Sequence, residues 1–346
     1  MFDLNKIIRS NIKVLTPYSS ARDEFSGQAS IYLDANENPF NTGFNRYPDP
    51  MQWALKEKIA ALKKVVRKEN ILLGNGSDEV IDLLLRAFCE PKEDNILTFP
   101  PTYGMYEVYG NINNIAIQKI ALNSDFQIDV PVALKAINAN TKLIFVCSPN
   151  NPSGGAIDPD AIKSLLKNFE GIVVIDEAYA DFSAQESWIN YLDLYPNLFV
   201  MQTFSKAWGL AALRLGVGYA SENIIKVLNK IKPPYNINEL TQQSVIKKLE
   251  NATDVQEQIN AINQQRDLLA EALSALPIVK KVYPSDANFL LVQVIDANKT
   301  YQYLVEKGII VRNRTTVVLC EGCIRITIGT AQENTEVINA LKEMKI

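Results

Sequence analysis

Histidine is absent from this sequence of 346 residues. Zinc sites that use histidine ligands are therefore excluded, and so is the side chain that most often transfers protons near neutral pH. Proton transfer at that pH must instead use a carboxylate, a tyrosine, a cysteine or a lysine whose pKa is depressed. The absence of histidine therefore limits which side chains can transfer protons or bind a metal in this protein, before any motif is considered.

Long apolar runs and an excess of basic residues are also missing. No apolar run approaches the roughly 18 residues of a membrane-spanning helix, and the N-terminal residues show no signal-peptide core. The formal net charge is −4, whereas a nucleic-acid-binding surface needs a basic stripe. We therefore expect a cytoplasmic protein that binds small molecules and has no membrane or nucleic-acid partner.

Cysteine is scarce, with four residues in the chain. Cys320 and Cys323 form a C-x-x-C pair, but no second pair follows, as a zinc site of this type would require. Reduced thiols of a cytoplasmic enzyme are the simplest interpretation. We expect no metal and assign these two cysteines no role.

The length of the chain favours two domains. Residues 1–45 lack periodicity and are expected to form an irregular N-terminal arm. Residues 46–240 alternate short apolar runs with helical patterns, which predicts a large domain with a mostly parallel sheet between helices. Residues 241–346 mix strand and helix patterns and are expected to form a smaller α+β domain. The predicted fold class is α/β.

Individual elements follow from the same periodicities. In the large domain we predict strands at 95–99, 142–147, 171–176 and 198–202, and helices at 51–65, 74–88 and 158–169. In the small domain we predict strands at 289–294 and 323–329, and helices at 300–308 and 334–344. Pro159 is expected to start one helix, and Ser77 or Asp78 to cap another.

Polar residues end or follow three of these strands. Asp176 ends the third predicted strand, and Asn151 and Lys206 follow the second and the fourth. Ligands of open α/β sheets bind outside the carboxyl ends of the strands, so we expect these residues to share one crevice. Lysine can form a Schiff base with the aldehyde of pyridoxal phosphate, and a carboxylate can keep its ring nitrogen protonated. Tyr179 is expected to hydrogen-bond the ring oxygen together with Asn151.

A phosphate-binding site is predicted beside them. The segment GNGSDE opens a helix, so the backbone N–H groups of Ser77 and Asp78 can face an anion. Thr203 and Ser205 would add hydroxyl donors, and Arg214 would grip the phosphate with its forked guanidinium.

Motifs along nearly the whole chain resemble those of one enzyme family. Between about residues 15 and 335 the chain contains, in this order, DANENP, NRYPDP, GNGSDE, RAFCEP, PPTYGMY, SPNNPSG, DEAY, TFSKAWGLAALRLG, GIIVR and CIRITIGT. This order resembles the fold-type I, pyridoxal-phosphate-dependent aminotransferases of class I and II, and most closely the histidinol-phosphate aminotransferases. Ser153 in NNPSG departs from the family's usual threonine but keeps the hydroxyl.

The resemblance implies an activity and a cofactor site. The enzyme would transfer the amino group of L-histidinol phosphate to 2-oxoglutarate, giving imidazole-acetol phosphate and L-glutamate in histidine biosynthesis. Lys206 would form the Schiff base and move the proton, with Asp176 and Tyr179 as the other catalytic residues. The implied cofactor-binding residues are Ser77, Asp78, Tyr103, Asn151, Asp176, Tyr179, Thr203, Ser205, Lys206, Arg214 and Tyr47.

It also implies a substrate site and a homodimer. Arg325, assisted by Arg312, would bind the anionic end of the substrate, and Tyr18 and Asn36 would belong to an N-terminal segment that closes over it. Tyr47 would reach the cofactor phosphate of the neighbouring subunit, which makes the active unit a dimer.

Other functions share the same cofactor motifs. An aromatic amino acid aminotransferase would use another amino donor. A lyase resembling threonine-phosphate decarboxylase would release carbon dioxide without needing an oxo acid. A regulator that only senses the cofactor is expected to need a DNA-binding domain, for which the short N-terminal arm leaves no room.

Overall fold

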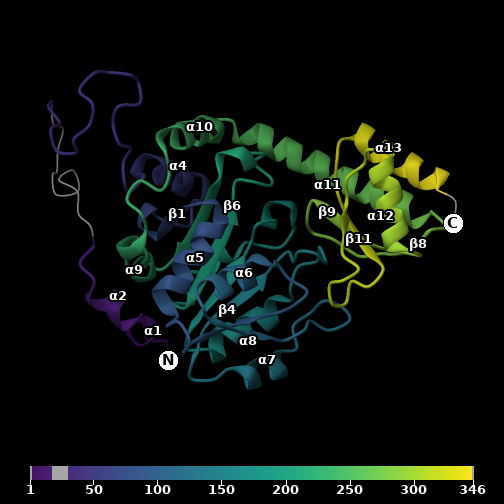
Figure 1. The fold of residues 1–346 in the computed structure, drawn as a ribbon, viewed down its shortest axis with the longest axis horizontal. Helices are drawn as coiled ribbons and strands as arrows, with labels where there is room; N and C mark the ends of the chain where they lie inside the picture. The colour runs from purple at the N-terminus through teal and green to yellow at the C-terminus, as the bar shows by residue number, and fades with distance from the viewer. Residues whose placement is uncertain (1, 18–29, 345–346) are drawn as a thin grey trace.

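Two sheets organise the chain in the computed structural model, which describes residues 2–17 and 30–344 (Figure 1). A seven-stranded sheet has the strand order β1-β7-β6-β5-β4-β2-β3, and a four-stranded sheet has the order β10-β11-β9-β8. The strands of the first are β1 (Ile71–Asn75), β2 (Asn95–Thr98), β3 (Ala116–Lys119), β4 (Thr141–Cys147), β5 (Ile172–Asp176), β6 (Leu198–Thr203) and β7 (Leu215–Ala220). Those of the second are β8 (Val279–Val282), β9 (Phe289–Val294), β10 (Arg312–Asn313) and β11 (Cys323–Thr327).

The large sheet is mostly parallel, as predicted. Strands β2 to β6 pair in parallel, whereas β7 is antiparallel to both β6 and β1. Cys147 lies opposite Asp176 in the β4–β5 register, and Asp176 lies opposite Met201 in the β5–β6 register. The carboxyl ends of β4, β5 and β6 therefore meet at one edge, where the polar residues after them come together.

Helices cover both faces of this sheet. The helices up to the last strand of the sheet are α1 (Leu4–Ile7), α2 (Ser10–Val14), α4 (Trp53–Lys63), α5 (Gly76–Phe88), α6 (Met105–Ile112), α7 (Val130–Ala136) and α8 (Pro159–Asn168). They are followed by α9 (Glu222–Ile231), α10 (Glu239–Leu249), α11 (Ala252–Ser274), α12 (Ala297–Glu306) and α13 (Ala331–Glu343).

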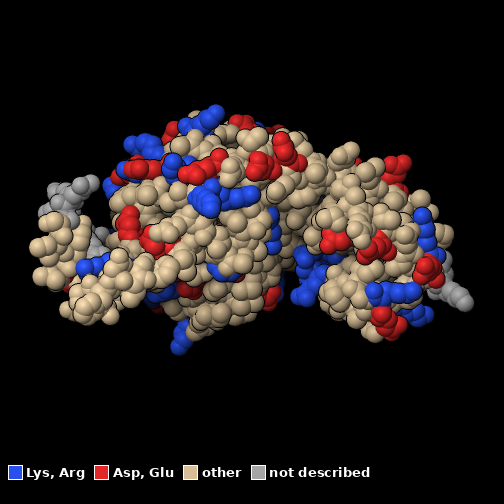
Figure 2. Space-filling view, turned by 90° about the horizontal axis from the view of Figure 1, so that it is seen from above, with Lys and Arg blue, Asp and Glu red and all other residues tan. Residues whose placement is uncertain are grey.

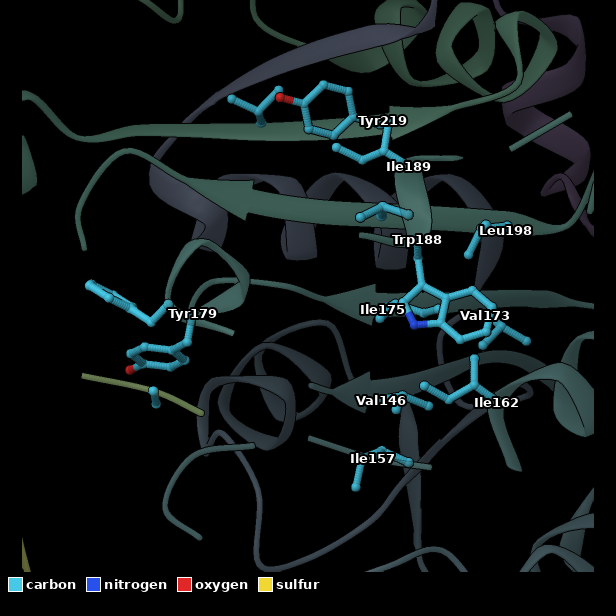
Figure 3. Packing of buried hydrophobic residues seen from close by; sticks show 14 of the residues in the cluster. Val146, Ile157, Ile162, Val173, Ile175, Tyr179, Trp188, Ile189, Leu198 and Tyr219 are labelled. Carbon is cyan, nitrogen blue, oxygen red and sulfur yellow. The ribbon is translucent and has the colours of Figure 1, made fainter. Parts of the chain in front are cut away.

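The apolar runs are continuous because successive residues of a strand point to opposite faces of the sheet, and an apolar core covers each face. On β4, Leu143 and Phe145 pack with α5 and α9 on one face, while Ile144 and Val146 pack with α4 and α8 on the other. Figure 3 shows part of the second core, with Trp188 lying over β5, the strand that carries Val173 and Ile175. Burial on both faces fixes the strand ends that carry the site.

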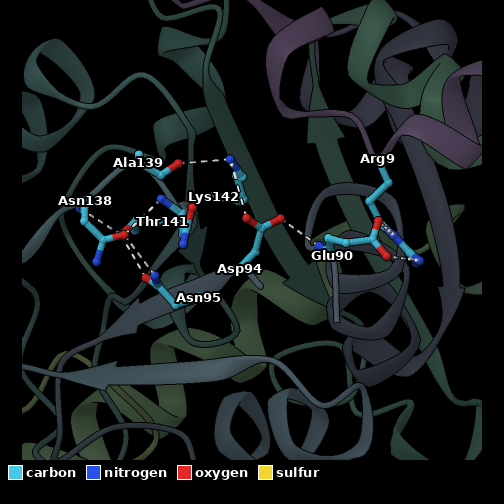
Figure 4. Close-up of polar contacts among 9 residues, drawn as sticks. Arg9, Glu90, Asp94, Asn95, Asn138, Ala139, Thr141 and Lys142 are labelled. Carbon is cyan, nitrogen blue, oxygen red and sulfur yellow. Dashed lines mark hydrogen bonds and ion pairs between the residues drawn. The ribbon is translucent and has the colours of Figure 1, made fainter. Parts of the chain in front are cut away.

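Two local predictions were wrong. The arm was expected to be irregular, but α1 and α2 form there, and Arg9 before α2 makes two hydrogen bonds of 3.0 and 3.1 Å to the Glu90 carboxylate (Figure 4). Helix α5 begins at Gly76, so its N-cap is Asn75 and neither Ser77 nor Asp78 caps it. Ser77 and Asp78 instead lie in the first turn.

The small sheet is antiparallel and has its own apolar core with α12 and α13. Helix α11 runs from the large sheet toward the small one (Figure 1). We propose the division into an arm (1–45), a large domain (46–240) and a small domain (241–346). Within residues 2–17 and 30–344, no helix combines the length and the apolar character needed to cross a membrane.

Candidate active site

A small cavity of about 130 Å³ lies at the carboxyl ends of β4, β5 and β6. Asn151, Asp176 and Lys206 all line it, as the strand pattern predicted. The other lining residues are Ser77, Asp78, Tyr103, Cys147, Ala178, Tyr179, Thr203, Ser205, Ala211 and Arg214. Ten residues predicted to bind the cofactor thus line one cavity, although they are spread from residue 77 to residue 214.

Asp176 carries a buried carboxylate in this cavity, with 2% of its surface exposed. Burial raises its pKa to about 6, while hydrogen bonds from the Tyr106 hydroxyl and the Ala178 N–H act to lower it. These bonds measure 2.6 and 3.0 Å. Tyr106 is fully buried and stacks on Phe145, with ring centroids 4.8 Å apart. Sequence reasoning missed Tyr106, although it lies one helical turn beyond Tyr103.

Lys206 lies near the aromatic ring of Tyr179, with its Nζ 5.7 Å from the ring centroid. Its side chain opens onto the cavity, yet the surrounding protein displaces enough water to lower its pKa. The cations of Arg325 and Arg214 lower that pKa further, while Asp176 and Asp78 oppose the change. A larger fraction of neutral amine follows, and neutral amine is the form that acts as nucleophile or base.

Hydrogen-bond donors gather where α5 begins. Gly76 has φ +76°, and a β-carbon there would lie 2.6 Å from Nη2 of Arg214, so glycine allows the guanidinium to approach the helix N-terminus. The Thr203 hydroxyl donates a hydrogen bond of 3.0 Å to the Ser205 hydroxyl. The Asn75 side chain makes no capping bond, which leaves N–H groups of the first turn available to an anion.

A second cavity of about 690 Å³ adjoins the first and shares Tyr103, Asn151, Tyr179 and Lys206 with it. Figure 2 shows a hollow between the two lobes of the molecule, with Lys and Arg side chains beside it. Three arginines line this cavity, namely Arg312, Arg314 and Arg325. Sequence reasoning identified the first and the last and missed Arg314.

Arg325 lines the larger cavity and contacts Asn151, which lines both cavities. Its Nη1 donates a hydrogen bond of 2.5 Å to Oδ1 of Asn151, and Nδ2 of Asn151 lies 3.4 Å from the Tyr179 hydroxyl. Its guanidinium lies 5.1 Å from the ring centroid of Phe289. This arrangement places a guanidinium beside the lysine-containing cavity.

Comparison with known proteins identifies the family. Residues 31–341 match the model of the family "Aminotransferase class I and II". The histidinol-phosphate aminotransferase of Flavobacterium johnsoniae is 56% identical over 99% of this chain and 98% of its own. The chain is a class I and II aminotransferase, and it belongs to the histidinol-phosphate aminotransferases.

Solved structures agree with this fold. The histidinol-phosphate aminotransferase of Clostridium acetobutylicum has a TM-score of 0.79 and 25% identity, over 87% of this chain and 90% of its own. That of Sinorhizobium meliloti, in complex with pyridoxal 5′-phosphate, has a TM-score of 0.78 and 22% identity, over 86% and 82% of the two chains. The aminotransferase fold predicted from the sequence is thus confirmed.

Pyridoxal 5′-phosphate is the cofactor of this aminotransferase family, and the small cavity has the donor set that it needs. The hydroxyls, the Arg214 guanidinium and the start of α5 suit a phosphate. At the other end, the buried Asp176 carboxylate suits a protonated ring nitrogen. Lys206 lies in the same cavity and suits the aldehyde. We propose these roles for the residues.

Three residues predicted for the aminotransferase site are not in these cavities. Tyr18 lies outside the described residues. Asn36 and Tyr47 line a separate groove of about 800 Å³ beside α10, where Tyr47 stacks on Tyr235 with ring centroids 4.5 Å apart. Their predicted roles therefore stay proposals, which for Tyr47 depend on a second subunit.

Removal of the Tyr106 hydroxyl is expected to shift the pH dependence of the aminotransferase. In Tyr106→Phe, Asp176 loses a hydrogen bond that lowers its pKa, so its carboxyl stays protonated up to a higher pH. The acid limb of the kcat/KM profile should move to higher pH, with a loss of about tenfold below neutrality. The control is Tyr219→Phe, which removes another buried tyrosine hydroxyl, on β7. An acid limb that does not move would show that Tyr106 has no part in setting this pKa.

Proposed function

We propose that this enzyme transfers the amino group of L-histidinol phosphate to 2-oxoglutarate, giving imidazole-acetol phosphate and L-glutamate. The observation that carries this proposal is that Lys206 lines both cavities. The small cavity offers donors for the cofactor phosphate, and the large one offers arginines for an anionic substrate. Relatives that are 56% and 55% identical to this chain are named histidinol-phosphate aminotransferase, which agrees with this substrate.

Asp176 supplies the buried negative charge that would face the ring nitrogen of the cofactor. When bound, pyridoxal phosphate supplies an aldehyde that condenses with amines and a ring that withdraws electrons from the substrate Cα. The carboxylate of Asp176 stabilises positive charge on a ring nitrogen beside it, and the Tyr106 and Ala178 donors keep that carboxylate ionised and in place. Both donors are rigid, because one belongs to a stacked, buried tyrosine and the other to the backbone.

Lys206 is the proton carrier. Its pKa is lowered by burial and by two arginines, so Nζ is available as a neutral base. We assign to Nζ the removal of the proton from the substrate Cα, and the same nitrogen would hold that proton and return it later in the reaction. No histidine is required for either transfer, which agrees with the composition.

The large cavity receives the anionic end of both substrates. Histidinol phosphate carries a phosphate and no carboxylate, whereas glutamate carries two carboxylates, so the same arginines must accept either oxyanion. Arg325 is placed for this because it hydrogen-bonds Asn151 at the boundary of the cavities. Arg312, on the neighbouring strand, adds a second positive charge.

Product analysis distinguishes this function from its alternatives. The purified enzyme would be incubated with 2-oxoglutarate and one of three amino donors, namely L-histidinol phosphate, phenylalanine or threonine phosphate. Threonine phosphate would also be tested without an oxo acid. Formation of glutamate with imidazole-acetol phosphate, at a kcat/KM well above that for phenylalanine, supports the proposal. Faster turnover of phenylalanine would favour an aromatic aminotransferase. Carbon dioxide released from threonine phosphate without an oxo acid would favour a lyase.

The active unit is proposed to be a homodimer in which Tyr47 completes the neighbouring site. Tyr47 lines a groove of its own chain that is separate from the Lys206 cavity, so a role for it in cofactor binding requires a second copy. A cytoplasmic location is part of the same proposal and agrees with four unpaired cysteines.

Mixing two inactive variants is expected to restore activity. Tyr47→Ala lacks the crossing tyrosine and Lys206→Ala lacks the base, but a mixed dimer contains one site with both side chains. After subunit exchange, an equimolar mixture should approach about a quarter of the unmodified activity, because half of the dimers are mixed and each has one intact site. The control is each variant mixed with itself. If the mixture gains nothing although mass measurement shows mixed dimers, Tyr47 acts within its own chain or not at all.

A further inference from the structure

Three arginines at the small sheet line one cavity, and none of them is paired with a carboxylate of the described residues. Arg312 on β10 lies directly opposite Arg325 on β11 in the antiparallel register. Arg314 follows two residues after Arg312, and its N–H donates a hydrogen bond of 2.9 Å to the Cys323 carbonyl. Like charges directly opposite each other destabilise a sheet. The sheet therefore carries a positive cluster whose cost is not offset by its own strands.

Among the residues that the structure describes, no carboxylate is paired with this cluster. Across the described ranges 2–17 and 30–344, none of the three guanidiniums forms an ion pair with Asp or Glu. Glu107 lines the same cavity, but Lys119 holds its carboxylate at 2.6 Å. Nε of Arg314 and Nε of Arg325 are buried without a hydrogen-bond partner. Buried donors left unpaired cost free energy, so these groups indicate an anionic ligand.

Arg314 is the least expected member of the cluster. It is half-buried, and burial together with the charges of Arg325 and Arg312 lowers its pKa. A carboxylate has two oxygens and one charge, and one forked guanidinium is enough to bind it. A phosphate near neutral pH carries close to two charges and has three free oxygens, so it can engage a third guanidinium.

We propose that Arg314 is a specificity-determining residue that makes the large cavity favour a phosphate dianion over a carboxylate. This inference rests on the proposed function, and it deepens that function by assigning the preference for a phosphorylated donor to one side chain. Arg325 and Arg312 bind either oxyanion, and Arg314 contributes when phosphate is present.

The test is Arg314→Gln in the cofactor-saturated enzyme, with L-histidinol phosphate and L-histidinol, which differ only in the phosphate, and with glutamate as a third donor. For L-histidinol phosphate, kcat/KM should fall about 30-fold, as expected for loss of a charge-assisted hydrogen bond in a buried site. For L-histidinol and for glutamate it should change by less than about threefold. Arg314→Lys should recover part of the loss, because it keeps the charge but not the fork. Lys299→Gln is the control, since it removes a positive charge from an exposed side chain of the same domain.

A second measurement keeps this inference separate from the proposed function. Inorganic phosphate should inhibit the glutamate half-reaction competitively, and its inhibition constant should rise about tenfold or more in Arg314→Gln. If the unmodified enzyme did not use histidinol phosphate, the proposed function would fail, and the phosphate inhibition constant would still decide the role of Arg314. An unchanged inhibition constant, or equal losses with L-histidinol phosphate and L-histidinol, would overturn the inference.

Discussion

Lys206→Ala is expected to lower turnover by at least about 10⁴-fold, since it removes both the nucleophile and the base. Among the described residues, Lys206 is the lysine that lines both the cofactor cavity and the substrate cavity. Tyr179 also lines both cavities, but burial raises its pKa far above neutrality, so its phenol is a poor base there.

Cofactor binding should survive this substitution in weakened form. The hydroxyls of Thr203 and Ser205, the Arg214 guanidinium and the start of α5 are untouched, so the proposed phosphate site remains. Turnover would be measured by glutamate formation and cofactor content by absorbance. Added methylamine should restore part of the turnover in proportion to its concentration, because a free amine can enter the space left by the side chain. Lys226→Ala, on the exposed side of α9, serves as the control. Turnover within tenfold of the unmodified enzyme would refute the role of Lys206.

Asp176→Asn should lower kcat/KM by about 10²–10³-fold with both substrates. Asparagine keeps the size of the side chain but cannot balance a positive charge on the ring nitrogen, so the ring would withdraw electrons from Cα less strongly. The loss should appear in both half-reactions, because both depend on the same ring. Steady-state kinetics with each substrate in turn, at saturating cofactor, would measure it.

Glu177→Gln is the matched control for this substitution. Glu177 is the next residue and is also buried, but it does not line either cavity and instead accepts hydrogen bonds from Ser187, Trp188 and Gln202. Its replacement should lower thermal stability while changing kcat/KM by less than about threefold. Similar kinetic losses in the two variants would mean that Asp176 contributes only to folding.

The sequence predicted those parts of the fold that follow from local patterns. Four strands of the large sheet were recognised because both faces are buried, and the position of the site followed from where three of them end. Strands β1, β3 and β7 of this sheet were missed. The glycine-containing sequences of β1 and β7 resemble loops, and these two strands are stabilised by antiparallel pairing with each other. Pairing between distant segments leaves no periodic signal in either one.

The residues missed in the site share a similar reason. Tyr106 reaches Asp176 because α6 packs it against Phe145 on another element, which no local spacing reveals. Arg314 resembles an ordinary loop arginine until the strand register places it beside Arg312 and Arg325. The N-cap of α5 was misplaced by two or three residues, because Gly76 at positive φ starts the helix earlier than the hydroxyl pattern indicates.

A single half-reaction tests the central claim most directly. The purified enzyme, loaded with pyridoxal phosphate, would be mixed with L-histidinol phosphate and no oxo acid, and its absorbance followed while the products are analysed. The proposed function predicts complete conversion of the bound cofactor to its amine form, with one imidazole-acetol phosphate released per active site. An unchanged spectrum with this donor, together with full conversion by an aromatic amino acid, would contradict it.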